Sequence, residues 1–397
     1  MDKKPLFVRK SSQNMTHGQI TAKQIFMDKI KSGKYKEIST KCLCGADEDL
    51  LLAEEDRYGI PFHTVICKKC GMMRANPYYS ADTIAEFYAN EYSPLYRELD
   101  SCDEGFWKKY LEYGNERVKW IEQKIGSLSG KKVYEIGCGS GATLFCFKQR
   151  GAEVYGCDFG EKFMQFGKEK GINILCGEWP VLKQYGKADV VVINHVLEHI
   201  ANPLEYLKKI KEVMKEDTCL YIGVPFISQI EVGVYEYDLF RYIQNAHAWY
   251  FSERTLSALL KAAGYQIIDI KASEYIMCTP QGKEEEYGIG LEHESSETIA
   301  HLECWDRTLD AVLKYKEKLE EEKKKIEERR AVWEEEKAKI LEERMVLLEE
   351  CSSLREIKQE LLEKCKKENE KYITALNDRK KAVEEKNALL DDRKKLR

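Results

Sequence analysis

Short apolar runs alternate with amphipathic stretches through the middle of the chain. The stretches have the period of helices, and we expect strands at residues 133–136, 152–158, 172–175, 188–193 and 218–224. The run at 188–193 is almost wholly apolar, as a parallel strand covered on both faces should be. Strands that alternate with helices predict an α/β fold with a doubly wound, Rossmann-like sheet, whose ligand lies at the carboxyl ends of the strands.

The last part of the chain has a different pattern. From Glu303 to Arg397 it is dominated by Glu and Lys, contains no Gly or Pro, and places an apolar residue at every seventh position from Trp305 to Leu361. A sustained heptad predicts a long helix that forms a coiled coil. The companion positions are mostly basic, which weakens the expected seam. Self-association, a solitary charged helix and packing on another protein therefore all stay open.

The apolar run that begins at Val133 ends in a glycine-rich turn. Glu135 is followed by Gly137, Gly139 and Gly141, and then by a helical stretch. Glycines let the backbone approach a nucleotide, and the helix N-terminus points at it. A carboxylate beside such a turn suits the ammonium group of S-adenosylmethionine (SAM) better than a pyrophosphate. A dinucleotide site and a purely structural turn are the alternatives.

A more specific motif follows the fourth apolar run. The sequence NHVLEHIANP begins at Asn194, after the segments VYEIGCGSG and VYGCD. Together these segments resemble the class I SAM-dependent methyltransferases over roughly residues 90–275. The resemblance implies SAM as cofactor and a Rossmann-like methyltransferase sheet.

The resemblance also implies roles for single residues. The glycine turn would pass the methionine moiety, and Asp158 would bind the ribose hydroxyls. Adenine contacts are expected at Glu178 and Trp179, where a Gly-Asp pair is commoner in the family. Asn194 and His195 match the floor beside the reactive methyl group, although a structural role for His195 is equally open. The implied cofactor-binding residues are Glu135, Gly137, Gly139, Gly141, Asp158, Glu178, Trp179 and Asn194.

Four cysteines lie upstream in two pairs. Cys42 and Cys44 form a C-x-C pair, and Cys67 and Cys70 form C-x-x-C. Two pairs at the tips of hairpin turns predict a tetrahedral, structural Zn²⁺ site of the ribbon type. Ordinary buried cysteines, or His63 in place of one ligand, are the alternatives. The segment CKKCGMMRANPYYS resembles the zinc-ribbon leader of bacterial sugar methyltransferases, in which the first pair is usually C-x-x-C.

The segment 226–252 is long and rich in aromatic and ionisable side chains. We expect it to form a lid over the methyl acceptor. The resemblance to the sugar methyltransferases implies that His247 acts on the acceptor, and a neutral imidazole is a suitable base for a hydroxyl proton. Tyr242, Glu236 and His195 are the reserve candidates, and a structural histidine is the alternative. The expected catalytic residues are His247, Tyr242 and His195.

Charge and composition limit the classes of partner that we expect for this chain. The 397 residues include 64 Lys and Arg against 69 Asp and Glu, so nothing indicates an electrostatic nucleic-acid binder. The chain has no apolar run of membrane-spanning or signal-peptide length. Its 14 cysteines without a secretion signal predict reduced thiols and a cytoplasmic location.

These patterns together predict an enzyme with several segments. We expect a SAM-dependent methyltransferase that modifies a hydroxyl of a sugar, nucleotide-sugar or glycan in surface-polysaccharide synthesis. It would be a homo-oligomer through the C-terminal helix, with other proteins of a glycan-assembly complex as further candidate partners. The alternatives are a methyltransferase for non-sugar small molecules and a SAM-binding scaffold. The expected segments are an extension with one short helix (1–40), a zinc-ribbon-like module (41–80), the methyltransferase domain (81–275), a linker (276–302) and the long helix (303–397).

Overall fold

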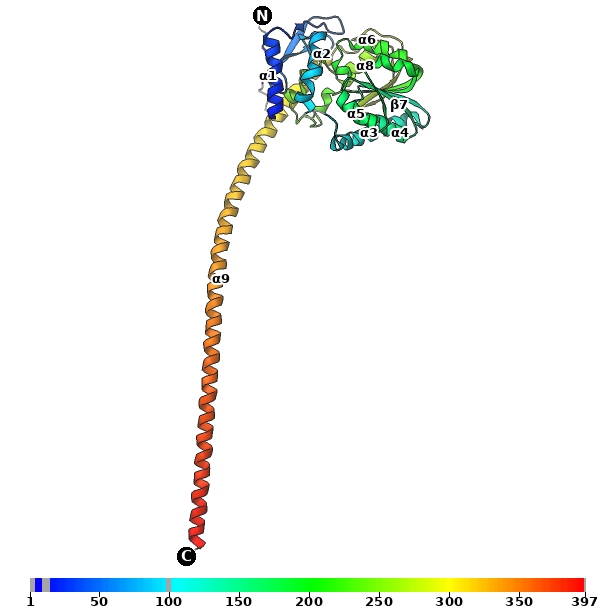
Figure 1. The fold of residues 1–397 in the computed structure, drawn as a ribbon. Helices are drawn as coiled ribbons and strands as arrows, with labels where there is room; N and C mark the ends of the chain where they lie inside the picture. Colours follow the sequence, from blue (N-terminus) through cyan, green and yellow to red (C-terminus); the bar gives the residue numbers. More distant parts are fainter. Residues whose placement is uncertain (1–3, 9–14, 98–100, 396–397) are drawn as a thin grey trace. The chain divides into compact units, whose positions relative to one another are not determined.

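The computed structural model describes residues 4–8, 15–97 and 101–395 (Figure 1). The expected extension at 1–40 therefore lies partly outside the described residues. The chain divides into two compact units, one ending at Val312 and the other beginning at Leu313. Among the described residues, no helix has the length and apolar character needed to cross a membrane.

A mixed seven-stranded sheet forms the centre of the first unit, in the order β12-β13-β10-β9-β6-β7-β8. The strands from β10 to β8 are parallel neighbours, and β13 is antiparallel to both β10 and β12. The order reverses beside β6, which is where ligands bind in open α/β sheets. The strands are β6 (Lys132–Ile136), β7 (Glu153–Asp158), β8 (Asn173–Cys176), β9 (Ala188–Asn194), β10 (Met214–Gly223), β12 (Gln266–Lys271) and β13 (Tyr275–Thr279).

Helices cover both faces of this sheet (Figure 1). Val190 and Val192 of β9 pack in the cluster that includes α3 and α4, while Val191 and Ile193 pack with α6 and α8. Both faces of β9 are therefore buried, which explains its continuous apolar sequence. The Rossmann-like fold predicted from the alternating pattern is confirmed. The covering helices are α3 (Glu104–Ile125), α4 (Ala142–Gln149), α5 (Glu161–Glu169), α6 (Pro203–Ile210) and α8 (Glu253–Ala262).

Strand β13 lies where the sequence pattern predicts the start of a linker. Tyr275 and Met277 pack with the α3 and α4 cluster, and Ile276 and Cys278 pack on the opposite face. A strand buried on both faces has a short, continuous apolar sequence. Periodicity alone does not distinguish such a run from a segment of helix or loop.

The paired cysteines lie beside a second, four-stranded sheet with the order β11-β4-β3-β2, and Cys67 is the last residue of β3. Three of its strands come from the N-terminal region, but β11 comes from the expected acceptor lid, where Trp249 pairs with Arg74 and Tyr250 with Met73. Part of the expected lid is thus a strand of the cysteine module. The strands are β2 (Asp49–Glu55), β3 (Pro61–Cys67), β4 (Met73–Ala75) and β11 (Trp249–Tyr250).

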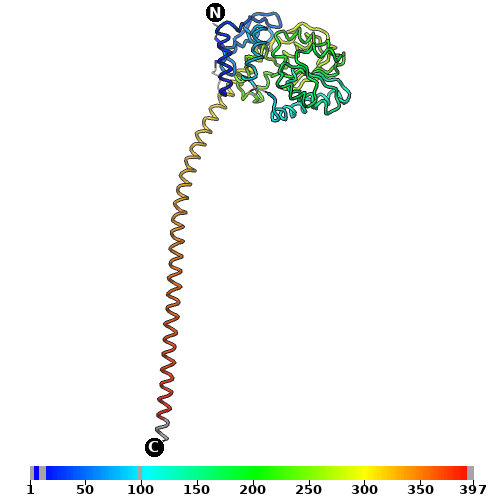
Figure 2. Tube along the Cα trace, in the orientation of Figure 1, coloured from blue at the N-terminus to red at the C-terminus, as the bar shows by residue number. Residues whose placement is uncertain are grey.

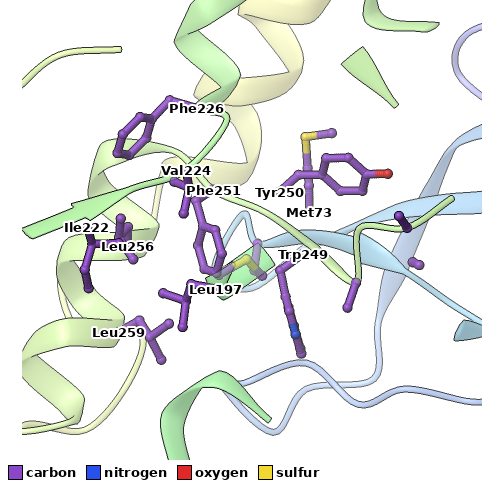
Figure 3. Close-up of a cluster of buried hydrophobic side chains, with 14 of the residues drawn as sticks. Met73, Leu197, Ile222, Val224, Phe226, Trp249, Tyr250, Phe251, Leu256 and Leu259 are labelled. Atoms are coloured by element: carbon purple, nitrogen blue, oxygen red, sulfur yellow. The ribbon is translucent and has the colours of Figure 1, made fainter. Parts of the chain in front are cut away.

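The cysteine module and the large sheet share one hydrophobic core. Figure 3 shows Met73 of β4 beside Tyr250 and Phe251, with Leu256 of α8 and Val224 after β10 in the same cluster. The smaller N-terminal elements complete this core. They are α1 (His17–Lys31), the paired strands β1 (Glu37–Ile38) and β5 (Tyr78–Tyr79), and α2 (Ala81–Asn90).

Helix α9 (Glu294–Lys395) is continuous over 102 residues, as the trace in Figure 2 shows. It begins before the expected position 303, because its first turn packs on the cysteine module: a Cβ on Gly71 would lie 2.7 Å from the Glu294 carbonyl carbon. Trp305 and Leu309 are buried in the first unit. From Leu313 to Leu390 the side chains are exposed. The long helix is confirmed, and its pairing into a coiled coil stays a prediction.

Candidate functional site

The glycine turn between β6 and α4 has an open centre. Gly137, Gly139 and Gly141 all have positive φ, at 72°, 53° and 75°. A Cβ on Gly137 would lie 2.3 Å from Val196, and one on Gly141 would lie 2.8 Å from Ile174. A Cβ on Gly139 would meet nothing within 4 Å. The outer glycines therefore allow tight packing, and the middle glycine leaves room for a ligand against bare backbone.

Two carboxylates flank this turn. Asp158, at the end of β7, accepts hydrogen bonds from the backbone N–H groups of Gly139 (2.8 Å) and Gly160 (2.7 Å). Glu135 of β6 is buried, and its Oε2 has no hydrogen-bond partner within the described part of the chain. Burial raises the pKa of Glu135 to about 7, although Arg117 acts against the shift. A buried acid with one unpaired oxygen beside an open turn fits a cationic ligand group, such as the ammonium of SAM.

The start of α4 adds free backbone donors. Its N-cap is Gly141, and no side chain caps it. The N–H groups of a first helical turn have no partner within the helix, so they are available to an oxygen-bearing ligand. We call Glu135, Asp158, the glycine turn and the first turn of α4 the cradle. It offers both hydrogen-bond acceptors and hydrogen-bond donors near the open space at Gly139.

The end of β9 lies next to this cradle in the sheet. The backbone N–H of His195 donates to the carbonyl of Gly223 (2.9 Å), and a Cβ on Gly223 would lie 2.3 Å from Oδ1 of Asn194. His195 has φ of 53°, a conformation uncommon outside glycine, and its side chain is exposed. Local strain of this kind often accompanies a site. The expected floor residues therefore lie at the carboxyl edge of the sheet.

The expected adenine contacts differ in exposure. Trp179 is buried at the start of a 3₁₀ helix (Trp179–Tyr185), with Lys183 Nζ 5.0 Å from its ring centroid. Glu178, the residue before it, is exposed. Their roles stay predictions, and Glu178 is the weaker of the two because water already solvates it.

Most of the residues expected to act on the methyl acceptor are buried. Tyr242 is fully buried, its hydroxyl donates to the Pro225 carbonyl (2.7 Å), and burial raises its pKa well above the usual range. This geometry argues against Tyr242 as a base. His247 is also buried, and burial followed by the neighbouring His199 keeps its pKa well below the usual range. His247 is therefore neutral, but it lies beneath the surface, whereas His195 is at the surface.

The four paired cysteines converge. Cys42 Sγ is 3.4 Å from Cys70 Sγ, and Cys44 Sγ is 3.6 Å from Cys67 Sγ. All four sulfur atoms lie within 4.8 Å of one another, and none is in a disulfide. His63 is not a member of this cluster. Four converging sulfurs, three of them on buried cysteines, fit a tetrahedral metal site with four protein ligands.

Two residues near the site were missed by the sequence reasoning. Arg117 of α3 donates through Nη1 to Thr143 Oγ1 (2.8 Å) and acts on the Glu135 charge. Glu198 is a fully buried acid that follows β9. Its position inside the VLEHI motif was an available signal, but only the flanking histidines drew attention.

Comparisons with known proteins identify the central domain. Residues 110–270 match a protein family described as a methyltransferase domain. This segment of the chain therefore matches a methyltransferase domain. The ubiquinone biosynthesis O-methyltransferase of Acinetobacter baumannii is 34% identical over 108 residues, which are 25% of this chain and 46% of that protein. The protein of the same name from Bordetella parapertussis is 29% identical over 175 residues, covering 40% of this chain and 72% of the relative.

The chain thus spans less than half the length of the Acinetobacter relative. Among solved structures, magnesium protoporphyrin IX methyltransferase from Synechocystis, with bound SAH, is 17% identical. That similarity covers 50% of this chain and 99% of the other, with a TM-score of 0.38.

The relatives correct the expected acceptor. Sequence reasoning expected a sugar, nucleotide-sugar or glycan, together with carbohydrate biosynthesis and a glycan-assembly complex. The matching proteins are instead named for ubiquinone biosynthesis, which is not a carbohydrate pathway. The sugar expectation was wrong because it rested on the cysteine leader, which lies outside the matched domain.

Proposed function

We propose that this chain transfers a methyl group from SAM to a hydroxyl oxygen of a small, non-sugar acceptor. The observation that carries the proposal is the cradle, which combines the open space at Gly139 with the unpaired, buried Oε2 of Glu135. The names of the matching O-methyltransferases favour an oxygen acceptor and, by analogy, a quinol-type hydroxyl.

The residues of the cradle would each hold one part of the cofactor. Glu135 would accept from the ammonium group, which would satisfy its unpaired oxygen. Asp158 would accept from the ribose hydroxyls with the lone pairs that its bonds to Gly139 and Gly160 leave over. SAM, when bound, supplies a methyl carbon on a sulfonium that departs as a thioether. Positioning is the main contribution that such a displacement needs from the protein.

The acceptor hydroxyl must lose a proton as its oxygen bonds to the methyl carbon. The carbon–sulfur bond breaks and its electron pair stays on sulfur, while the proton passes to a base. We assign that base to His195, because its imidazole is exposed beside the floor residue Asn194. A buried carboxylate, Glu198, lies 3.4 Å from its Nδ1 and would stabilise the imidazolium.

Zinc and self-association complete the proposal. Cys42, Cys44, Cys67 and Cys70 would hold a structural Zn²⁺, which would stabilise the module that carries β11. The exposed apolar column of α9, with Ile340 in its middle, would pair with a second copy of the chain.

The test combines binding and turnover. Isothermal titration should show SAM binding to the purified chain, and labelled methyl groups should pass from SAM to members of a panel of small hydroxyl compounds that includes quinols. His195→Gln should leave SAM affinity nearly unchanged and reduce turnover by about 10²- to 10⁴-fold. Binding without transfer to any hydroxyl, or transfer only to nitrogen or carbon, would refute the proposal.

A further inference from the structure

The surface of α9 carries a second column of side chains beside the apolar one. The apolar column runs at seven-residue spacing from Leu319 to Leu361, and its side chains are between 45% and 64% exposed in the single chain. We call the residues four positions after each of its members the companion column. These residues are basic at first and then include two cysteines. They are Lys323, Arg330, Lys337, Arg344, Cys351, Lys358 and Cys365.

The two cysteines of the companion column lie on one edge of the apolar stripe. Cys351 and Cys365 are exposed, and neither is in a disulfide. They are two heptads apart, so they occupy the same seam position of a coiled coil. Cys304 is also exposed on α9, but it lies off both columns. Cys351 and Cys365 are therefore the thiols of α9 that would face a paired helix.

A groove on α9 provides the contacts that one residue of a parallel copy requires. In a parallel pair, a residue of the apolar column inserts between four residues of the facing helix. These are its own counterpart, the residue after that counterpart, and the companion residues on either side. For Leu361 all four belong to the groove, whose wall includes Cys365. The groove is lined by Leu354, Ile357, Lys358, Leu361, Leu362 and Cys365.

Charges beside the companion column suit the same parallel arrangement. A companion residue of one helix packs next to the residue that precedes the companion position on the facing helix. Arg330 is an exception, since Arg329 precedes it, but Glu334 follows Arg329 by five residues, where parallel helices form interhelical ion pairs. At three other basic positions the preceding residue is an acid: Glu322 before Lys323, Glu336 before Lys337 and Glu343 before Arg344.

We propose that two copies of α9 pair in parallel and in register, so that Cys351 and Cys365 each meet their counterpart and can be linked by a small-molecule disulfide. The inference rests on the self-association in the proposed function and adds its direction, its register and a covalent lock. A disulfide needs Cα atoms about 4.4–6.8 Å apart. Equal seam positions face each other in this way when the helices are parallel.

The linking reaction balances with oxidised glutathione as the oxidant. The Cys351 thiolate of one copy attacks a sulfur of the oxidant, whose sulfur–sulfur bond breaks and releases one glutathione thiolate. The Cys351 thiolate of the second copy then attacks the mixed disulfide, forms the interchain bond and releases the second glutathione. The two protein thiols give up two electrons and two protons, and the two glutathione thiolates take up the protons. Cys365 can react in the same two steps.

Oxidation of the full chain tests the direction and the register together. Protein treated with oxidised glutathione is run on a non-reducing gel. We expect wild type, Cys351→Ser and Cys365→Ser each to give a band of twice the chain mass that a reductant removes, because each remaining cysteine meets its own counterpart. The double variant Cys351→Ser/Cys365→Ser should stay at the mass of one chain, although Cys176 and Cys304 remain exposed.

The matched control moves the thiol by one residue. Ser352→Cys in the double variant places an exposed cysteine off both columns and should give no linked band. Circular dichroism should show the same helix content in every variant. Linking through Ser352→Cys as efficient as through Cys351 would overturn the proposal, because random collision would then explain it. Loss of the linked band in both single variants would also overturn it, since Cys351 would then face Cys365 in an antiparallel pair.

Light scattering of reduced wild-type protein separates this inference from the proposed self-association. The mass of two chains, together with the linked bands, supports both. The mass of two chains without any linked band would refute the parallel register and leave the self-association standing. The mass of one chain would refute both. Neither readout involves methyl transfer, so the proposed chemistry is tested independently.

Discussion

Glu135 and Glu198 are two buried glutamates at neighbouring strand ends, and both have unpaired oxygens. Their surroundings differ. Glu135 lies beside a glycine turn with open space at Gly139, whereas Glu198 faces imidazoles on segments locked together by hydrogen bonds. The same side chain is thus suited to two different tasks. A glutamate beside an open cradle can bind the organic ammonium of a cofactor that enters and leaves, whereas a glutamate enclosed beside imidazoles can stabilise the positive charge proposed for His195.

The largest expected effect is on binding of the cofactor. Glu135→Gln should weaken SAM binding by roughly ten- to a hundredfold, because a charge-assisted hydrogen bond contributes about 1.5–3 kcal/mol. Isothermal titration with SAM measures this effect, and Glu216→Gln, at an exposed acid near the start of β10, is the matched control. Equal affinities for both variants would remove Glu135 from the cofactor site.

The second effect concerns stability. Glu198→Gln should raise the free energy of unfolding by about 1–2 kcal/mol, since it removes a buried acid without hydrogen bonds. Urea unfolding measures the change, and Glu216→Gln, at an exposed acid, is the control that should leave the free energy of unfolding unchanged.

The third effect is a pH dependence confined to the cofactor side. Burial raises the pKa of Glu135 from 4.5 to about 7, so the folded protein holds a proton there that the unfolded chain has released. Glu135 therefore stabilises the fold below pH 4.5, and this contribution is lost as the pH rises through about 7. SAM needs the ionised form, so its affinity should increase up to about pH 7 and then level off.

Titration of SAM in buffers of different ionisation enthalpy measures this proton directly. Near pH 6.5 wild-type protein should release a proton on binding, and Glu135→Gln should not. Proton release that persists in the variant would assign it to another group.

The cofactor cradle could be predicted because it is local. Glu135 and its glycines lie within one turn, and each positive φ needs a glycine whatever the rest of the chain does. The position of His247 near Glu198 could not be predicted in the same way. His247 reaches Glu198 only because β11 adds to the cysteine sheet beside β4, a pairing between residues far apart in the sequence. No periodicity within either segment reports that contact.

This difference between local motifs and contacts of distant segments also explains why the predicted sugar acceptor was wrong. Residues 226–252 have the composition of a lid, but their final strand pairs with Met73 and Arg74, and Tyr242 is turned into the core. Which side chains face an acceptor is decided by this packing. A motif in the cysteine leader carries no such information, so its resemblance to sugar methyltransferases did not transfer to the substrate.

Substitutions in α9 should have the smallest effect on the cofactor site. Ile340 belongs to the heptad column and is exposed in the single chain, as is Leu341 beside it. Ile340→Glu should lower the molar mass measured by light scattering to that of one chain, because a charge in the seam opposes pairing. Leu341→Glu, which lies off the column, should not. SAM affinity should stay the same in both variants, since the cradle residues belong to the first unit. If SAM affinity changed with the oligomer, a second copy would have to contribute to the cofactor site, and the contrast between the two glutamates would no longer belong to one chain.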